Sequence, residues 1–103
     1  MMSKIKSENN YRVTIEQVNA SDNGKTLQFE FEDREDLFNV VENLKKGSGL
    51  EAPIATRVAV ALRLLGPVMM KNRKHALFID FMPHFKVFMQ HLKNTVKKSA
   101  QEK

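Results

Sequence analysis

Two short segments of the sequence alternate apolar and polar residues, and this alternation constrains the fold more than any other feature. The apolar positions in residues 11–16 and 26–32 all carry odd numbers: Tyr11, Val13, Ile15, Leu27, Phe29 and Phe31. A period of two that is rich in β-branched and aromatic residues is typical of a strand with one buried face. The intervening residues 19–24 are rich in turn formers. Together these segments predict an antiparallel β-hairpin.

The shared odd numbering also predicts the kind of loop that joins the two strands. Odd residues can face odd residues only across a loop with an odd number of residues, or across a bulge. A two-residue Asn23-Gly24 turn without a bulge would turn one apolar set into water. We therefore expect a longer or bulged loop, with Gly24 at positive φ.

The residues that follow predict a first helix. Asp33 is a favourable N-cap, and the acidic residues after it suit the positive end of a helix dipole. Apolar residues then recur at intervals of three and four: Leu37, Val40, Val41 and Leu44, with Phe38 widening the stripe. Lys45 and Lys46 are favourable in a last turn, and we expect Gly47 to end the helix.

A second and longer helix is predicted to begin at Pro53, because proline is favoured in the first turn. We expect its buried stripe to be formed by residues at helical spacing: Ile54, Val58, Ala61, Leu62, Leu65 and Met69. Four more apolar residues lie outside that stripe: Val60, Leu64, Val68 and Met70. A helix that is apolar nearly all round is buried on several sides. In a protein this small, it is either the central core helix or a helix shared with a second subunit, and for the second case Val60 and Leu64 are the candidate homodimer surface.

The C-terminal part of the chain contains one interruption and one more helix. Gly66-Pro67 predicts a kink in the long helix or, as the alternative, a break with a restart at Pro67. Residues 72–75 predict a polar corner, and Pro83 marks the start of the last helix. Apolar residues recur at helical spacing through this region, before and after Pro83: Leu77, Phe78, Phe81, Phe85, Phe88, Leu92 and Val96.

These elements predict an α+β fold, with an N-terminal antiparallel β-hairpin packed against three to four α-helices. A two-stranded hairpin is marginal in water, so we expect the helices to cover its apolar face. The chain of 103 residues fits one domain. We expect residues 1–10 to be a flexible lead-in, residues 11–97 a single α+β domain and residues 98–103 a flexible tail.

Charge and composition narrow the class of protein. Residues 1–52 carry a net charge of −3 and residues 53–103 a net charge of +8, which is typical of an electropositive surface or of two halves that attract each other. The absence of cysteine excludes disulfides and thiolate nucleophiles. The first ten residues lack the apolar stretch of a signal peptide, and the longest uninterrupted apolar run is residues 58–62. We expect a cytoplasmic protein without a membrane partner.

No catalytic, cofactor or metal site is expected. His84 and His91 are seven residues apart, which is too far for one metal ion without further ligands. His75, Asp80 and His84 form the only combination that could serve as a general-base pair, which keeps a small enzyme as a third hypothesis. The phenylalanines recur on one predicted inner face, so we expect them in a core and not as a platform for bases.

One basic segment is the candidate site for an anion, an acidic partner or nucleic acid: Lys71, Asn72, Arg73, Lys74 and His75. Three lysines on one side of the last helix extend it: Lys86, Lys93 and Lys97. Two structural explanations compete with binding. The cations could neutralise carbonyls at the end of the long helix. They could also pair with the acidic side chains of the strands: Glu16, Glu30 and Glu32.

The chain resembles a small bacterial family, domain of unknown function 3861. The resemblance is carried by five stretches: Tyr11-Arg12-Val13-Thr14, Asp36-Leu37-Phe38, Leu65-Gly66, Lys71-Asn72-Arg73-Lys74-His75-Ala76-Leu77-Phe78 and Pro83-His84-Phe85. The run from Lys71 to His75 is the most specific, and Pro67 stands where an acidic residue is expected. The resemblance implies a bacterial cytosolic protein of this size and brings no activity, cofactor or catalytic residue.

We therefore expect a non-enzymatic protein-interaction or regulatory domain that forms a homodimer or binds another protein. The alternative function is anion or nucleic-acid binding at Lys71–His75.

Overall fold

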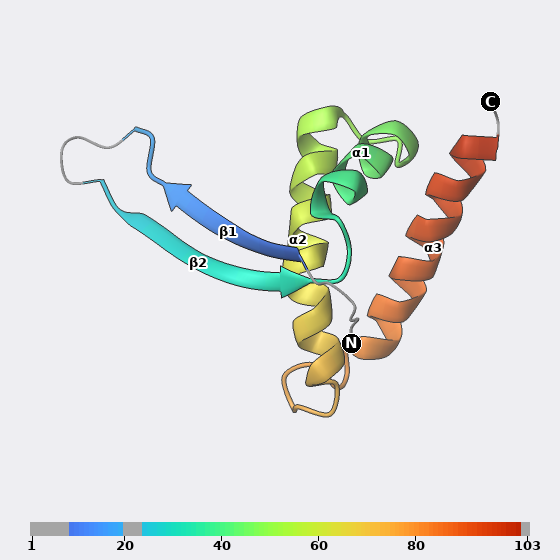
Figure 1. Cartoon of the computed structure of the whole chain (residues 1–103). Helices are drawn as coiled ribbons and strands as arrows, with labels where there is room; N and C mark the ends of the chain where they lie inside the picture. The colour runs from blue at the N-terminus through green and yellow to red at the C-terminus, as the bar shows by residue number, and fades with distance from the viewer. Residues whose placement is uncertain (1–8, 20–23, 102–103) are drawn as a thin grey trace, which may run out of the picture. The chain divides into compact units, whose positions relative to one another are not determined.

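The computed structural model describes residues 9–19 and 24–101, which form two compact units. The hairpin unit ends at Asp36 and the helical unit begins at Leu37. The element order is β1, β2, α1, α2 and α3 (Figure 1). The fold is therefore α+β, with a two-stranded antiparallel hairpin followed by three helices.

The predicted strand pairing is confirmed in the hairpin unit. Strand β1 (Asn9–Glu16) pairs with β2 (Thr26–Asp33), and the facing residues are Tyr11 and Phe31, Val13 and Phe29, and Ile15 and Leu27. The Gln17 N–H donates to the Lys25 carbonyl at 3.2 Å, so the loop is longer than a tight turn, as the odd numbering requires. The φ angle of Gly24 depends on Asn23, and residues 20–23 lie outside the described residues.

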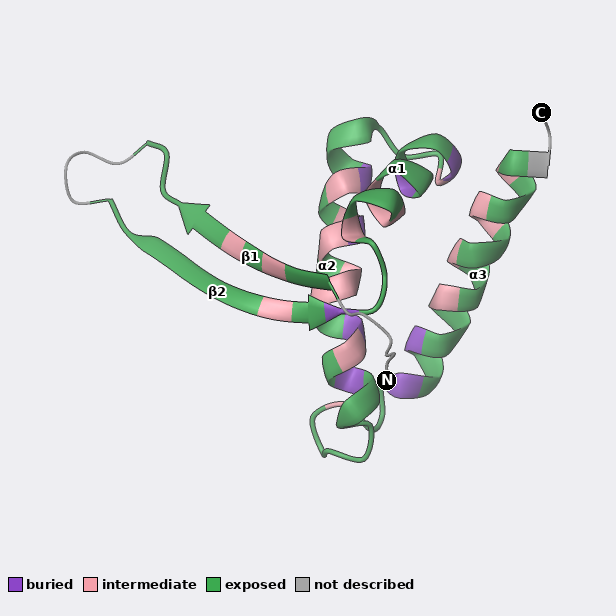
Figure 2. Cartoon of the chain, in the orientation of Figure 1, coloured by how far each residue is buried: buried purple, intermediate pink, exposed green. Residues whose placement is uncertain are grey.

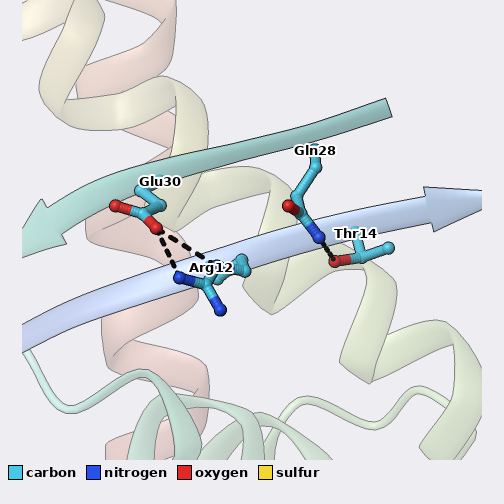
Figure 3. A network of polar contacts seen from close by, with 4 residues as sticks. All are labelled: Arg12, Thr14, Gln28 and Glu30. Atoms are coloured by element: carbon cyan, nitrogen blue, oxygen red, sulfur yellow. Dashed lines mark hydrogen bonds and ion pairs between the residues drawn. The ribbon is translucent and has the colours of Figure 1, made fainter. Parts of the chain in front are cut away.

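The two faces of the hairpin differ in character. On the odd-numbered face the rings of Tyr11 and Phe31 are 5.4 Å apart and half-buried. On the even-numbered face the Arg12 guanidinium binds the Glu30 carboxylate at 2.8 Å, and Gln28 Nε2 donates to Thr14 Oγ1 at 2.9 Å (Figure 3). Such cross-strand pairs each add a few tenths of a kcal/mol, up to ~1 kcal/mol, to the stability of a sheet.

The apolar face of the hairpin unit is most exposed near the loop. Ile15 is 53% exposed, Leu27 is 57% exposed and Phe29 is 38% exposed. Figure 2 shows most of both strands as exposed, with short half-buried stretches. A two-stranded sheet with an uncovered apolar face lacks the burial that makes larger sheets stable.

The predicted start of the first helix at Asp33 is also wrong. Asp33 is the last residue of β2, and its Oδ1 accepts the N–H of Glu35 at 3.1 Å. The Glu35 carbonyl accepts bonds from the Tyr11 hydroxyl and from Asn9 Nδ2, both at 3.2 Å. These bonds hold residues 33–35 against β1, so helix α1 (Leu37–Gly47) starts four residues later. Because β1 includes Asn9 and Asn10, the predicted lead-in of residues 1–10 is too long.

The helical unit contains two small cores, one towards each end of α2 (Ala52–Lys71). The first core joins α1 to α2 and to α3 (Met82–Gln101) through Leu44, Ala55 and Ala59, with Leu92 and Val96 of α3 packed against them. The second core joins the end of α2 to the start of α3: Met69, Met82 and Phe85, with Leu62, Phe78 and Met89 packed against them. Figure 2 shows these buried positions on α1, α2 and the start of α3.

The buried side of α2 differs from the predicted stripe. The buried residues are Ala55, Ala59, Gly66 and Met69, whereas Ile54 is 44% exposed and Leu65 is 47% exposed. Successive residues are turned by about 100°, so a shift of one position moves the stripe by that angle. Small residues occupy the buried side of α2 because they allow neighbouring elements to approach closely. The Cζ atom of Phe85, for example, lies 3.6 Å from where a Cβ at Gly66 would be.

The remaining helix bounds can be compared with the predictions made from prolines and glycines. Pro53 lies in the first turn of α2 as predicted, and the helix continues through Pro67 to Lys71 without a break. Gly47 is the last residue of α1, and the positive φ that turns the chain after it belongs to Gly49, at 87°. Gly47 itself therefore does not turn the chain. Helix α3 continues to Gln101, so the predicted tail of residues 98–103 is too long.

Gly47 serves close packing, which yields a test. A Cβ built there would lie 3.1 Å from both Cα and Cγ1 of Val96 and 3.2 Å from its carbonyl oxygen. Because two of these atoms are backbone, Gly47→Ala must displace α3 at a cost of ~1–3 kcal/mol, less up to ~1 kcal/mol from the better helix propensity of alanine. We expect urea unfolding to show a net loss of stability.

The control is Gly49→Asn. A Cβ at Gly49 would meet nothing within 4 Å, and asparagine tolerates a left-handed backbone. We expect little change in its unfolding free energy. A Gly47→Ala variant as stable as the parent would show that α1 and α3 do not approach closely.

Candidate functional site

The segment that joins α2 to α3 is a compact series of turns at the end of α2 opposite to α1 (Figure 1). His75 organises it. The His75 N–H donates to the Asn72 carbonyl, and the His75 carbonyl accepts the N–H groups of Phe78 and Ile79, all at 2.9 Å. Its ring atom Nδ1 accepts the Leu77 N–H at 3.0 Å. His75 therefore fixes the shape of the segment, and its Nδ1 is already engaged.

Asn72 closes the C-terminal end of α2. Its backbone N–H donates to the carbonyls of Val68 and Met69, both at 3.1 Å, and its side-chain Nδ2 donates to Val68 at 2.7 Å. The last carbonyls of a helix need such donors. Asn72 therefore satisfies the carbonyls of Val68 and Met69. The explanation that the cations neutralise the carbonyls at the end of α2 does not hold for these two carbonyls.

The cations of the basic corner (residues 71–75) are all exposed. No described residue of the helical unit forms a hydrogen bond or ion pair with the side chain of Lys71, Arg73 or Lys74. Together with Met70, the corner residues line one open hollow. In the hairpin unit, the Glu30 carboxylate is already held by Arg12. The corner therefore presents three fixed cations to solvent.

The surroundings of the corner carry little negative charge. Residues 52–101 contain nine lysines and arginines and one acidic residue, Asp80. Helix α3 contains no aspartate or glutamate among residues 82–101. Exposed charges act over roughly 10 Å at moderate salt, so each group of neighbouring cations in this unit has a positive local potential that no nearby acidic side chain in the described sequence offsets.

The groups considered for catalysis are not gathered in the hollow. His75 lines it, whereas Asp80 and His84 do not. His75 Nδ1 accepts a backbone N–H, so that nitrogen is not free to act as a base. Among the described residues, no group of three histidine, aspartate or glutamate side chains is placed to hold a metal ion.

The candidate dimer surface at Val60 and Leu64 is half-buried. Three exposed apolar residues of α2 lie together on another side of the helix: Ile54, Leu65 and Val68, each 44–47% exposed. The apolar pattern did not separate these groups, because hydrophobicity alone does not show which apolar side of a helix will be buried. The sequence did contain one signal, which is the series of small residues on the buried side: Ala55, Ala59 and Gly66.

The length and composition of α2 also match those of a membrane-crossing helix. It has 20 residues and a mean hydropathy of 1.4 in its most apolar window, of which 22% is buried. The sequence predicts no such segment when only uninterrupted apolar runs are considered, because Arg57 and Arg63 interrupt them. Length and composition alone do not distinguish a membrane span from a core helix. The low burial does show that much of the apolar surface of α2 is not covered by the rest of the structure.

The fold is similar to that of a protein whose structure has been solved. The chain is similar to a protein of unknown function from Pectobacterium atrosepticum SCRI1043, whose crystal structure shares 35% identity with a TM-score of 0.76. The match covers 85% of this chain and 99% of that one. No curated protein matches the chain.

The class of protein is therefore a small α+β domain of unknown function with a solved-structure representative. The family model for domain of unknown function 3861 matches residues 9–94. The chain belongs to this family, as the resemblance implied. The matched region includes the hairpin, the basic corner and most of α3.

The Asn72 cap yields a second test. Asn72→Ala removes the side-chain bond to the Val68 carbonyl and should lower the unfolding free energy by ~0.5–1.5 kcal/mol. The matched control is Asn94→Ala in the exposed middle of α3, which should be neutral or slightly stabilising because alanine is the better helix former. Urea unfolding of both variants measures the difference. Equal effects at the two positions would show that Asn72 does not cap α2.

Proposed function

We propose that this chain is a non-enzymatic protein-interaction domain that acts as a homodimer. The observation that supports this is the imbalance between buried and exposed apolar side chains. Among the described residues, four large apolar side chains are buried: Leu44, Met69, Met82 and Phe85. Fifteen large ones are exposed. Isolated exposed apolar residues are normal, but gathered ones mark interaction surfaces.

The proposed dimer surface is the outer stripe of α2, defined as Ile54, Val58, Ala61, Leu65 and Val68. These residues follow the four-three spacing of helices that pair with one another. The buried side of α2, which faces the two cores, is centred about 100° away. Val58 also packs against the first core, so the stripe continues from packed into exposed surface.

The stripe suits a second copy of this chain because it reads nearly the same in both directions. Ile54 and Val68 lie seven residues before and after Ala61, while Val58 and Leu65 lie three before and four after it. A twofold dimer needs a surface that is complementary to itself, with residue i against j and j against i. Ala61 would sit at the crossing point, where a small side chain allows the two helices to approach.

The first test is the mass of the protein in solution. Analytical ultracentrifugation at low micromolar concentration should give twice the chain mass of 11.9 kDa. Leu65→Asp buries a charge in the stripe and should weaken the dimer by at least ~2 kcal/mol, or about 30-fold in Kd. Circular dichroism should show that the variant keeps its helices.

The matched control is Val87→Asp on α3. Val87 is 70% exposed and lies outside the stripe, so the same charge placed there should leave the dimer intact. A parent chain that is monomeric at all concentrations, or that partitions into detergent micelles in place of dimerising, contradicts the proposal. So does a Leu65→Asp variant that dimerises like the parent.

A further inference from the structure

One side of α3 is polar and basic along its length. Lys86, Lys93 and Lys97 fall within about 40° of one another around the helix axis. All three are exposed, and no described residue pairs with them. Gln90 lies between them and is exposed too. This lysine side of α3 contains no large apolar residue, and it begins one turn after the segment that carries the basic corner.

The arrangement is unfavourable for the helix itself. Lys93 and Lys97 are four residues apart, where like charges repel by a few tenths of a kcal/mol. Exposed helices are stabilised when acids and lysines alternate at this spacing, yet residues 82–101 contain no acid. Lys86 also lies near the positive end of the helix dipole. The charge pattern thus costs stability, and a negatively charged ligand would offset that cost.

We propose that the basic corner and the lysine side of α3 bind the phosphate backbone of nucleic acid. Residues 86–97 span about 16 Å of helix, which equals the length of duplex axis over which each strand carries about five phosphates, at 3.4 Å of rise each. A single small anion would use one end of such a row. Six cations without acidic partners among the described residues of the unit supply the electrostatic contacts that such binding requires.

The chemistry of this surface favours nucleic acid over a lipid bilayer. A helix that lies on a membrane has exposed apolar residues bordered by cations. The lysine side of α3 is bordered on one flank by Gln90 and Asn94, and on the other by Met89 and Val96, which pack against the two cores. The exposed Phe88 lies about 140–180° away around the helix. It cannot stack on bases held at the lysines. Binding is therefore directed at the backbone and is independent of base sequence.

Fluorescence anisotropy with a labelled DNA duplex of about 20 base pairs tests the proposal through its salt dependence. Six phosphate contacts give a slope of about −5.4 in log K against log salt, or a loss of about 10³-fold in affinity between 50 and 200 mM salt. The corner variant Lys71→Gln/Arg73→Gln/Lys74→Gln should halve the slope and lose only about 40-fold over that range. The helix variant Lys86→Gln/Lys93→Gln/Lys97→Gln should behave alike.

The matched control is Lys45→Gln/Lys46→Gln/Arg57→Gln, which removes the same charge from the same unit but leaves the corner and α3 intact. It should keep the full slope. Circular dichroism checks that each variant is folded, and if the corner variant is not, the helix variant carries the test alone.

Three results would overturn the proposal. One is a parent chain that does not bind the duplex at about 25 mM salt, where electrostatic binding is strongest. Another is a control that loses as much slope as the corner variant, since the effect would then come from net charge. The third is binding to vesicles with anionic lipids but not to DNA, abolished by Leu77→Ser. Ultracentrifugation of the same variants shows separately whether they dimerise.

Discussion

The helical unit depends on the small residues that line the inner side of α2. Ala55 and Ala59 are fully buried where Leu44 of α1 packs, and Gly66 lies under the Phe85 ring. Small side chains allow these close approaches but bury little apolar area, and the stabilisation from burial scales with that area at about 25 cal/mol per Å². The larger apolar residues of α2 are consequently turned outward, and one chain leaves much of its apolar surface in water.

The hairpin unit also has exposed apolar residues, although its strand register is well defined. Its register is well specified, because cross-strand partners match on both faces and Tyr11 and Asn9 bind the Glu35 carbonyl. Yet Ile15 and Leu27 are exposed near the loop. Hydrogen bonds and paired side chains fix which residues face each other, but they contribute little net stability without apolar burial. The hairpin unit therefore has a register that is defined by its own cross-strand pairs and hydrogen bonds.

The sequence predicts the hairpin register well and the helix details less well. A strand has a period of two, so the odd positions of Val13 and Phe29 exclude every register that would place them on opposite faces. The predicted start of α1 is wrong because Asp33 can cap a helix or a turn, and the bonds to Glu35 that decide between them are not local. The predicted buried side of α2 is wrong because Leu65 ranks above Ala59 in hydrophobicity, although close packing selects the smaller residue.

The basic corner was also predicted only in part from the sequence. Its cations are evident in the sequence, but the partners of the α2 carbonyls are not. Asn72 satisfies the carbonyls of Val68 and Met69, and His75 uses Nδ1 to hold Leu77. The polar residues of the segment thus have structural roles, while its three cations remain exposed. Those roles depend on the turn geometry, which no spacing rule predicts.

The most direct measurement of whether one chain is sufficient is the concentration dependence of unfolding. A dimer gains stability with concentration by mass action, because association favours the folded state. If folding and dimerisation are coupled, the urea midpoint should rise with protein concentration, with about 1.4 kcal/mol of added stability for each tenfold increase. A urea midpoint that is the same from about 1 to 100 μM protein would contradict the claim that the chain needs a second copy to cover its apolar surface.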